Sequence, residues 1–172
     1  MTSTASLYIF PESSDRVATL LVVTVALHRR PRHSHNPPTA MSARQEKLTE
    51  EANRRLVTNM YERVLKPLDS SRVDEFFARD YIQHNPLAAT GAKGLKDFLD
   101  WARARAPNAE HRVKRMFVDG DYVIAHVHVI INPGERGNAV VDIFRIANGH
   151  IAEHWDVAQE VPDQAANNNG MF

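Results

Sequence analysis

The chain of 172 residues contains no cysteine, which excludes disulfide bonds, thiol nucleophiles and thiolate metal sites. Any catalytic nucleophile or metal ligand must therefore be a histidine, a carboxylate or a hydroxyl group. The absence of cysteine is also typical of a reducing compartment, and we expect the protein to be cytoplasmic.

An excess of charge of either sign is lacking as well. The 21 basic residues are balanced by 21 acidic residues, so the sequence predicts no general attraction to nucleic acid or to an anionic membrane. Glycine-rich phosphate loops, H-E-x-x-H and G-x-S-x-G are also missing. Nucleotide binding and serine hydrolase chemistry therefore have no support.

The apolar run Val17–Leu27 is shorter than the roughly 18 to 20 residues that a transmembrane helix needs. Its acidic flank and the lack of a cleavage site after it do not favour a secretory signal. The following stretch, 29–39, is rich in Arg, His and Pro and is typical of a linker. We predict a disordered or non-native extension over 1–40, with organelle targeting as the alternative, a folded domain over 41–160 and a C-terminal tail over 161–172.

Helical periodicity dominates the first half of the folded domain. Apolar residues recur every four positions from Leu48 to Val64, and Pro67 ends this helix at about Lys66. A short helix through Phe76 and Phe77 and a third helix over 95–105 follow. Strands are then predicted over 113–118 and 122–131 and on both sides of Asn148. The pattern predicts an α+β fold, a cone-shaped barrel formed by a curved, mainly antiparallel sheet packed against three N-terminal helices.

The strongest local signal is the segment Val140–Val157, in which Asn148 and Gly149 favour a two-residue type I′ turn. A regular hairpin pairs Ile146 with Ile151 and distributes the side chains over two faces. One face carries Val140, Asp142, Phe144, Ile146, Ile151, Glu153, Trp155 and Val157, and the other carries Val141, Ile143, Arg145, Ala152, His154, Asp156 and Ala158. The first face is mostly large and apolar, so we predict that it points inward.

Asp142 is the main catalytic candidate, because a carboxylate between apolar neighbours on an inward face is suited to exchanging a proton with a substrate. The alternative is a structural salt bridge with an arginine. Glu153 would couple with Asp142 or lie at the sheet edge, and Trp155 with Phe144 would form a pocket wall. A bulge in the hairpin would instead bring His154 and Asp156 inward, and these two remain candidates for the alternative face.

Three further histidines are candidates. His126 and His128 project from one face of their strand, where they would line the pocket, hold a metal or lie in a dimer interface. His84 lies in an irregular segment, Gln83–Pro86, where it would act as an acid, a base or a hydrogen-bond donor, or would cap a nearby loop.

Several of these segments together resemble the SnoaL-like polyketide cyclase family, in particular its branch of predicted aldol-condensation-catalysing enzymes within the nuclear-transport-factor-two-like superfamily. The likeness covers about 41–172. It is carried by Tyr81–Pro86, Gly120-Asp121, Val141–Arg145, Asn148–Ile151, Glu153–Val157 and the C-terminal Asn169–Phe172.

The resemblance implies a cone with a deep apolar pocket, a homodimer formed through the sheet, and a reaction without metal or organic cofactor. It implies that Asp142 is the acid/base of an intramolecular aldol closure and that His84 is a loop histidine of the site. In the leading hypothesis His84, His126 or His128 donates to the enolate oxygen of a small hydrophobic or carbonyl-containing substrate, with Tyr81 in the pocket. A non-catalytic binding or dimerisation module, or an isomerase or hydrolase that uses the same residues, is the alternative.

Overall fold

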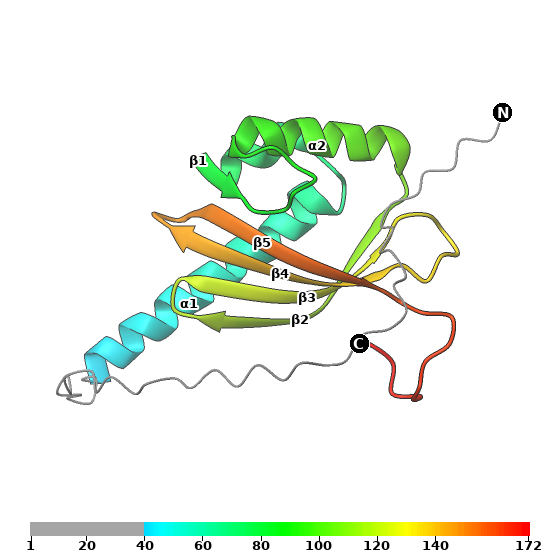
Figure 1. Ribbon diagram of the computed structural model, residues 1–172. Helices are drawn as coiled ribbons and strands as arrows, with labels where there is room; N and C mark the ends of the chain where they lie inside the picture. The colour runs from blue at the N-terminus through cyan, green and yellow to red at the C-terminus, as the bar shows by residue number, and fades with distance from the viewer. Residues whose placement is uncertain (1–39) are drawn as a thin grey trace, which may run out of the picture. The chain divides into compact units, whose positions relative to one another are not determined.

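The computed structural model describes residues 40–172 (Figure 1). The predictions for residues 1–39, including the apolar run, lie outside the described residues. Among the described residues, no helix is both long and apolar enough to cross a membrane. The elements in chain order are α1 (Ala40–Met60), the π-helical turn η1 (Tyr61–Leu65), the 3-10 helix η2 (Ser70–Glu75), β1 (Phe77–Gln83), α2 (Gly91–Arg105), β2 (Glu110–Asp119), β3 (Tyr122–Ile130), β4 (Asn138–Ala147) and β5 (His150–Glu160).

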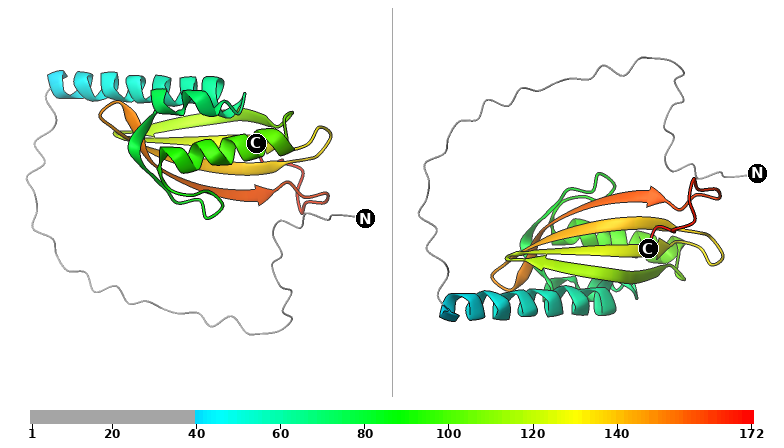
Figure 2. Two further views of the ribbon diagram at one scale, coloured as in Figure 1. Left: turned by 90° about the horizontal axis from the view of Figure 1, so that it is seen from above. Right: turned by 90° about the horizontal axis from the view of Figure 1, so that it is seen from below.

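Over this range the strands form one five-stranded sheet in the order β1-β5-β4-β3-β2. β1 is parallel to β5, and the other neighbours are antiparallel. The helices pack on one face of the curved, open sheet, as the two views of Figure 2 show. The predicted α+β fold is therefore confirmed. The sheet gains one strand over the prediction because Phe77, which was assigned to the second helix, begins β1.

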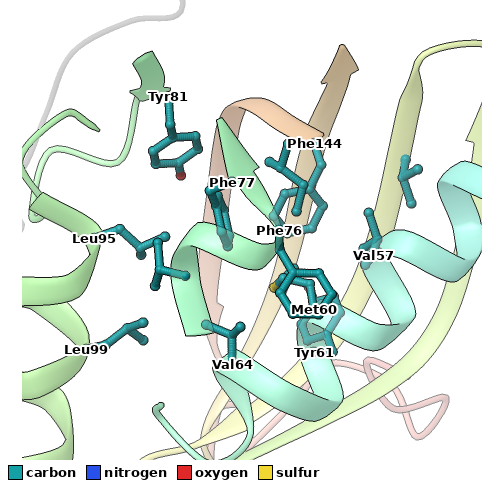
Figure 3. Close-up of a cluster of buried hydrophobic side chains, with 14 of the residues drawn as sticks. Val57, Met60, Tyr61, Val64, Phe76, Phe77, Tyr81, Leu95, Leu99 and Phe144 are labelled. Atoms are coloured by element: carbon teal, nitrogen blue, oxygen red, sulfur yellow. The ribbon is translucent and has the colours of Figure 1, made fainter. Parts of the chain in front are cut away.

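The core lies between α1, α2 and the inner face of the sheet (Figure 3). α1 contributes Val57 and Met60 to it, and η1 contributes Tyr61 and Val64. The predicted stripe was wrong in its first half, since Leu48 is 50% exposed. A spacing of four residues drifts around a helix that repeats every 3.6 residues, and the π-helical turn shifts the register once more.

The turn at Asn148-Gly149 is confirmed, with φ of 51° and 74°. The predicted pair of Ile146 with Ile151 is also present. The register then shifts, because Arg145 pairs with Glu153 and Ala152 forms a bulge. The regular hairpin register, which pairs Phe144 with Glu153 and Asp142 with Trp155, is therefore wrong beyond this point. The true partners are Phe144 with His154, Ile143 with Trp155 and Asp142 with Asp156.

This bulge exchanges the two predicted faces of β5. His154 and Asp156 join Asp142 on the inner face, under the helices, as the alternative prediction required. Glu153 and Trp155 lie on the outer face, away from Asp142. One additional residue in one strand is thus sufficient to change which polar side chains meet.

Candidate active site

Asp142 lies on β4 in the interior and is 8% exposed. The hydroxyl of Tyr61 donates a hydrogen bond to its Oδ2 over 2.5 Å, and Nε2 of His154 lies 3.1 Å from its Oδ1. Both carboxylate oxygens therefore have a polar partner, one from the helical layer and one from the neighbouring strand. This satisfies the requirement that a buried charge be hydrogen-bonded.

Tyr61 begins the π-helical turn that continues α1. Burial, followed by the negative charge of Asp142, raises the pKa of Tyr61 well above its ordinary value, so the phenol keeps its proton and acts as a donor. Its ring packs edge-on against Phe144, with 6.0 Å between the ring centroids. Sequence reasoning missed Tyr61 because the predicted helical stripe passed through Met60 and Val64 instead. Single π-helical turns are frequent at functional sites, although they have no clear sequence signal.

The tautomer of His154 follows from its second contact. Its Nδ1 lies 2.9 Å from Oε1 of Gln83, and the same oxygen accepts the backbone N–H of Asn85 over 3.1 Å. The backbone N–H can only donate, so the Gln83 atom is the amide oxygen and His154 Nδ1 must carry a proton. In a neutral ring, Nε2 would then face Asp142 with a lone pair. Because two acceptors do not approach to 3.1 Å without a proton, we infer that Asp142 and His154 share one.

Asp156 completes the inner polar cluster and lies opposite Asp142 in the sheet. Nδ2 of Asn85 donates to Oδ2 of Asp156 over 2.6 Å, while Oδ1 of Asn85 accepts the backbone N–H of Leu87. Tyr81 lies nearby and is 1% exposed. Its pKa is raised, mainly by burial and then by the charges of Asp156 and Asp142, so it also remains a phenol.

Three of these residues also form the described cluster that could hold a metal ion. Asp142, His154 and Asp156 each offer one ligand atom, and these atoms lie within 4.8 Å of one another. Carboxylate and imidazole ligands suit several divalent cations. A cation here would replace the proton between Asp142 and His154, so the two alternatives exclude each other.

A second polar cluster lies on the outer face and contains three residues that were predicted to accompany Asp142. Glu153 contacts His84 Nε2 and Arg145 Nε, each over 2.8 Å. The hydrogen bond from His84, followed by that from Arg145, lowers the pKa of Glu153. The His84 ring stacks on Trp155 with 4.6 Å between the centroids. The predicted proximity of His84, Glu153 and Trp155 to Asp142 is thus wrong, because of the bulge in β5.

His126 and His128 also lie on the outer face. Ala125 is the residue that pairs with Asp142, so the next residue along β3 points the other way. Both imidazoles pack near the ring of Phe172, at 5.5 and 4.3 Å between centroids, and His128 Nε2 donates to the carbonyl of Arg136. Their predicted place in a pocket with Asp142 is therefore wrong.

Two surface hollows of the described domain lie elsewhere. One of about 690 Å³ is lined by residues that include Arg79, Arg145 and His150, and one of about 410 Å³ is lined by outer-face residues that include His126. Neither is lined by Asp142.

Residues 57–154 match the sequence profile of the SnoaL-like domain family. No curated protein is significantly similar in sequence to this chain. A SnoaL-like polyketide cyclase from Agrobacterium tumefaciens is similar in structure, with a TM-score of 0.54 and 13% identity over 63% of this chain and 92% of that protein.

Two further solved structures show the same fold. TsrD from Streptomyces laurentii matches with a TM-score of 0.51 and 20% identity, over 65% of this chain and 89% of that one. A nuclear-transport-factor-two-like protein of unknown function from Cytophaga hutchinsonii matches with a TM-score of 0.53 and 14% identity, over 62% and 89%. At these identities the likeness is one of fold.

Proposed function

Because the chain belongs to the SnoaL-like domain family, we propose that it is a cofactor-independent enzyme that acts on a small carbonyl compound. Asp142, coupled to His154, is the general acid/base, and the reaction is an aldol-type ring closure. The observation that carries this proposal is the 3.1 Å contact between His154 Nε2 and Asp142 Oδ1, in a site supported by Tyr61 and Gln83.

The shared proton suits both halves of the reaction. With the proton on His154, Asp142 is a carboxylate that removes a proton from the carbon next to the substrate carbonyl. The resulting enolate attacks a second carbonyl carbon of the same molecule, a carbon–carbon bond forms, and the new alkoxide oxygen takes the proton back. The substrate is thus isomerised, and no co-reactant is consumed.

Tyr81 is placed to stabilise the enolate oxygen. Its side chain is buried, and it feels the negative charges of Asp156 and Asp142. A phenol with a raised pKa donates a hydrogen bond to an oxyanion without losing its own proton. The sequence-based assignment of Tyr81 to the substrate site is retained in the proposal, whereas the donor role moves from the outer-face histidines to this residue.

The polyketide cyclase from Agrobacterium tumefaciens supports the choice of substrate class, since it has this fold. Low exposure of Asp142 favours the alternative of a non-catalytic module, because both carboxylate oxygens are already hydrogen-bonded. The two possibilities differ in whether the protein accelerates the loss of a substrate proton.

Exchange of α-protons in D2O, followed by NMR on heptane-2,6-dione, tests the proposal. This diketone closes by an intramolecular aldol reaction to a six-membered ring. The Asp142→Asn variant should exchange at least about 100-fold more slowly than wild type, since acid/base groups contribute 10²–10⁴-fold. The matched control is Asp80→Asn, at an exposed position of β1. An Asp142→Asn variant with the wild-type rate, or a wild type that binds the diketone without accelerating exchange, would contradict the proposal.

A further inference from the structure

His111 lies on β2 and pairs with Val129 of β3. Among residues 40–172, its Nδ1 is the one buried side-chain nitrogen or oxygen that has no hydrogen-bond partner. Buried polar atoms are nearly always hydrogen-bonded, so this nitrogen is available for a hydrogen bond with a bound molecule.

The electrostatic environment connects His111 to the inner cluster. Burial lowers the pKa of its imidazole, the negative charge of Asp142 raises it, and the positive charge of Lys66 lowers it. Burial is the largest effect, so the ring is neutral near pH 7. A neutral imidazole has one N–H donor and one acceptor nitrogen, so Nδ1 provides one hydrogen bond.

Apolar side chains separate the two polar positions. Along β3, Ala125 pairs with Asp142 and Val129 pairs with His111, and Val127 lies between them on the same inner face. Ala125 and Val127 are fully buried. The inner face thus has an acid/base at one end, an unpartnered imidazole nitrogen at the other, and a hydrocarbon surface between them.

We propose that His111 is a specificity-determining residue whose Nδ1 binds a second oxygen of the substrate, while the carbon beside the first carbonyl faces Asp142. The role rests on the proposed function, because it assumes that the substrate enters the inner site. The ligand class is a compound with two oxygen functions joined by a short hydrocarbon chain. In the aldol closure, the Nδ1–H of His111 donates to the acceptor carbonyl and favours its attack by the enolate carbon.

Two ketones with equal carbon skeletons isolate this contact. Heptane-2,6-dione has the second carbonyl and heptan-2-one lacks it. The dissociation constants of both are measured by NMR titration of the full-length protein. Wild type should bind the diketone about tenfold or more tightly than the monoketone. The ratio of the two dissociation constants should fall to about one in His111→Phe, in which a phenyl ring without nitrogen replaces the imidazole. The affinity for heptan-2-one should be unchanged.

A second variant guards against a folding defect. In His111→Asn, a side-chain amide atom occupies the place of Nδ1, so the diketone preference should be largely restored. His150→Phe, at the exposed first residue of β5, is the matched control and should keep the full preference. Equal affinity of wild type for the two ketones, or a preference that survives in His111→Phe, would overturn the role of His111. The ratio of affinities reports on binding, whereas failure of the proposed function would appear as unaltered proton exchange in Asp142→Asn.

Discussion

Gln83 determines the protonation of His154. Its Oε1 lies 2.9 Å from Nδ1 of the imidazole and accepts the backbone N–H of Asn85 as well, so the Nδ1 proton is fixed and Nε2 faces Asp142. A neutral amide on one strand thereby sets the state of an acid/base pair on two others. The arrangement is the familiar one in which the partner of one ring nitrogen decides the role of the other.

Replacing Gln83 by Met should allow His154 to adopt the other tautomer. Without the amide oxygen, a neutral His154 can carry its proton on Nε2 and donate it to Asp142, which removes the need for a shared proton. We expect heptane-2,6-dione exchange to slow by about tenfold or more, as one misplaced proton weakens acid/base catalysis. Long-range ¹⁵N–¹H NMR of the imidazole should show Nδ1 protonated in wild type and Nε2 protonated in the variant. Gln159→Met, at an exposed position of β5, should change neither the exchange rate nor the tautomer of His154.

Tyr61→Phe should affect both stability and activity. The variant loses the 2.5 Å hydrogen bond to Asp142 and leaves Oδ2 without this buried donor. The free energy of unfolding should decrease by about 1–3 kcal/mol, the usual cost of an unsatisfied buried polar group. Urea denaturation measures the change, and exchange kinetics should show a slower proton transfer. Tyr122→Phe, at an exposed residue opposite Arg145 on the outer face, should stay within about 0.5 kcal/mol of wild type. An equal decrease in the free energy of unfolding in both variants would mean that the hydrogen bond to Asp142 does not stabilise the fold.

His111 should make the protein less stable as the pH falls. Its folded pKa is lowered from 6.5, so below this pH the unfolded chain binds a proton that the folded chain does not. Stability therefore rises with pH across the window from the lowered folded pKa up to about 6.5. The pKa of Glu153 is also lowered, so this carboxylate makes the protein less stable as the pH falls as well. Its effect appears only at more acidic pH, where the carboxylate becomes protonated.

Thermal unfolding between about pH 5 and 7.5 tests this dependence. The midpoint should decrease towards low pH in wild type and vary less in His111→Asn. His150→Asn should follow the wild-type curve. An equally steep curve for His111→Asn would assign the pH dependence to other groups.

Removal of metal ions should leave the activity unchanged. The proposal places a proton, and no cation, among Asp142, His154 and Asp156, although their ligand atoms lie within 4.8 Å of one another. Dialysis against EDTA should alter neither the proton exchange rate nor the unfolding midpoint. Elemental analysis should find far less than one metal ion per chain. Loss of activity that zinc or manganese restores in wild type, but not in Asp156→Asn, would establish a metal centre in place of the proton.

Local signals in the sequence were sufficient for the fold. The turn at Asn148-Gly149, the stop at Pro67 and the change from helical to strand periodicity all lie within a few residues of what they determine. Asp142 was found in the same way, since an acidic residue within an apolar strand is conspicuous. Its burial on the inner face agrees with the prediction.

The partners of Asp142 were harder to predict because they depend on distant or irregular features. The bulge at Ala152 replaced Glu153 and Trp155 by His154 and Asp156, and no residue type marks such a bulge. Tyr61 comes from another layer, 81 positions away in the chain, so only the packing of α1 and η1 on the sheet reveals it. Register and packing, rather than composition, decide which polar groups meet.

The helix-free face of the described sheet should form a homodimer interface. Val157 on β5 and Phe117 on the edge strand β2 are 69% and 58% exposed on this face, although both side chains are apolar. A stable interface buries about 800 Å² on each partner, and we expect the outer face of the five-stranded sheet to supply this area. Size-exclusion chromatography with light scattering at micromolar concentration should show a dimer. Val157→Glu should dissociate it, because a carboxylate would be desolvated at the centre of the contact. Leu87→Glu, on the loop after β1, is the matched control and should remain dimeric. A monomeric wild type would contradict the interface, and the exposed Val157 and Phe117 would then need another partner.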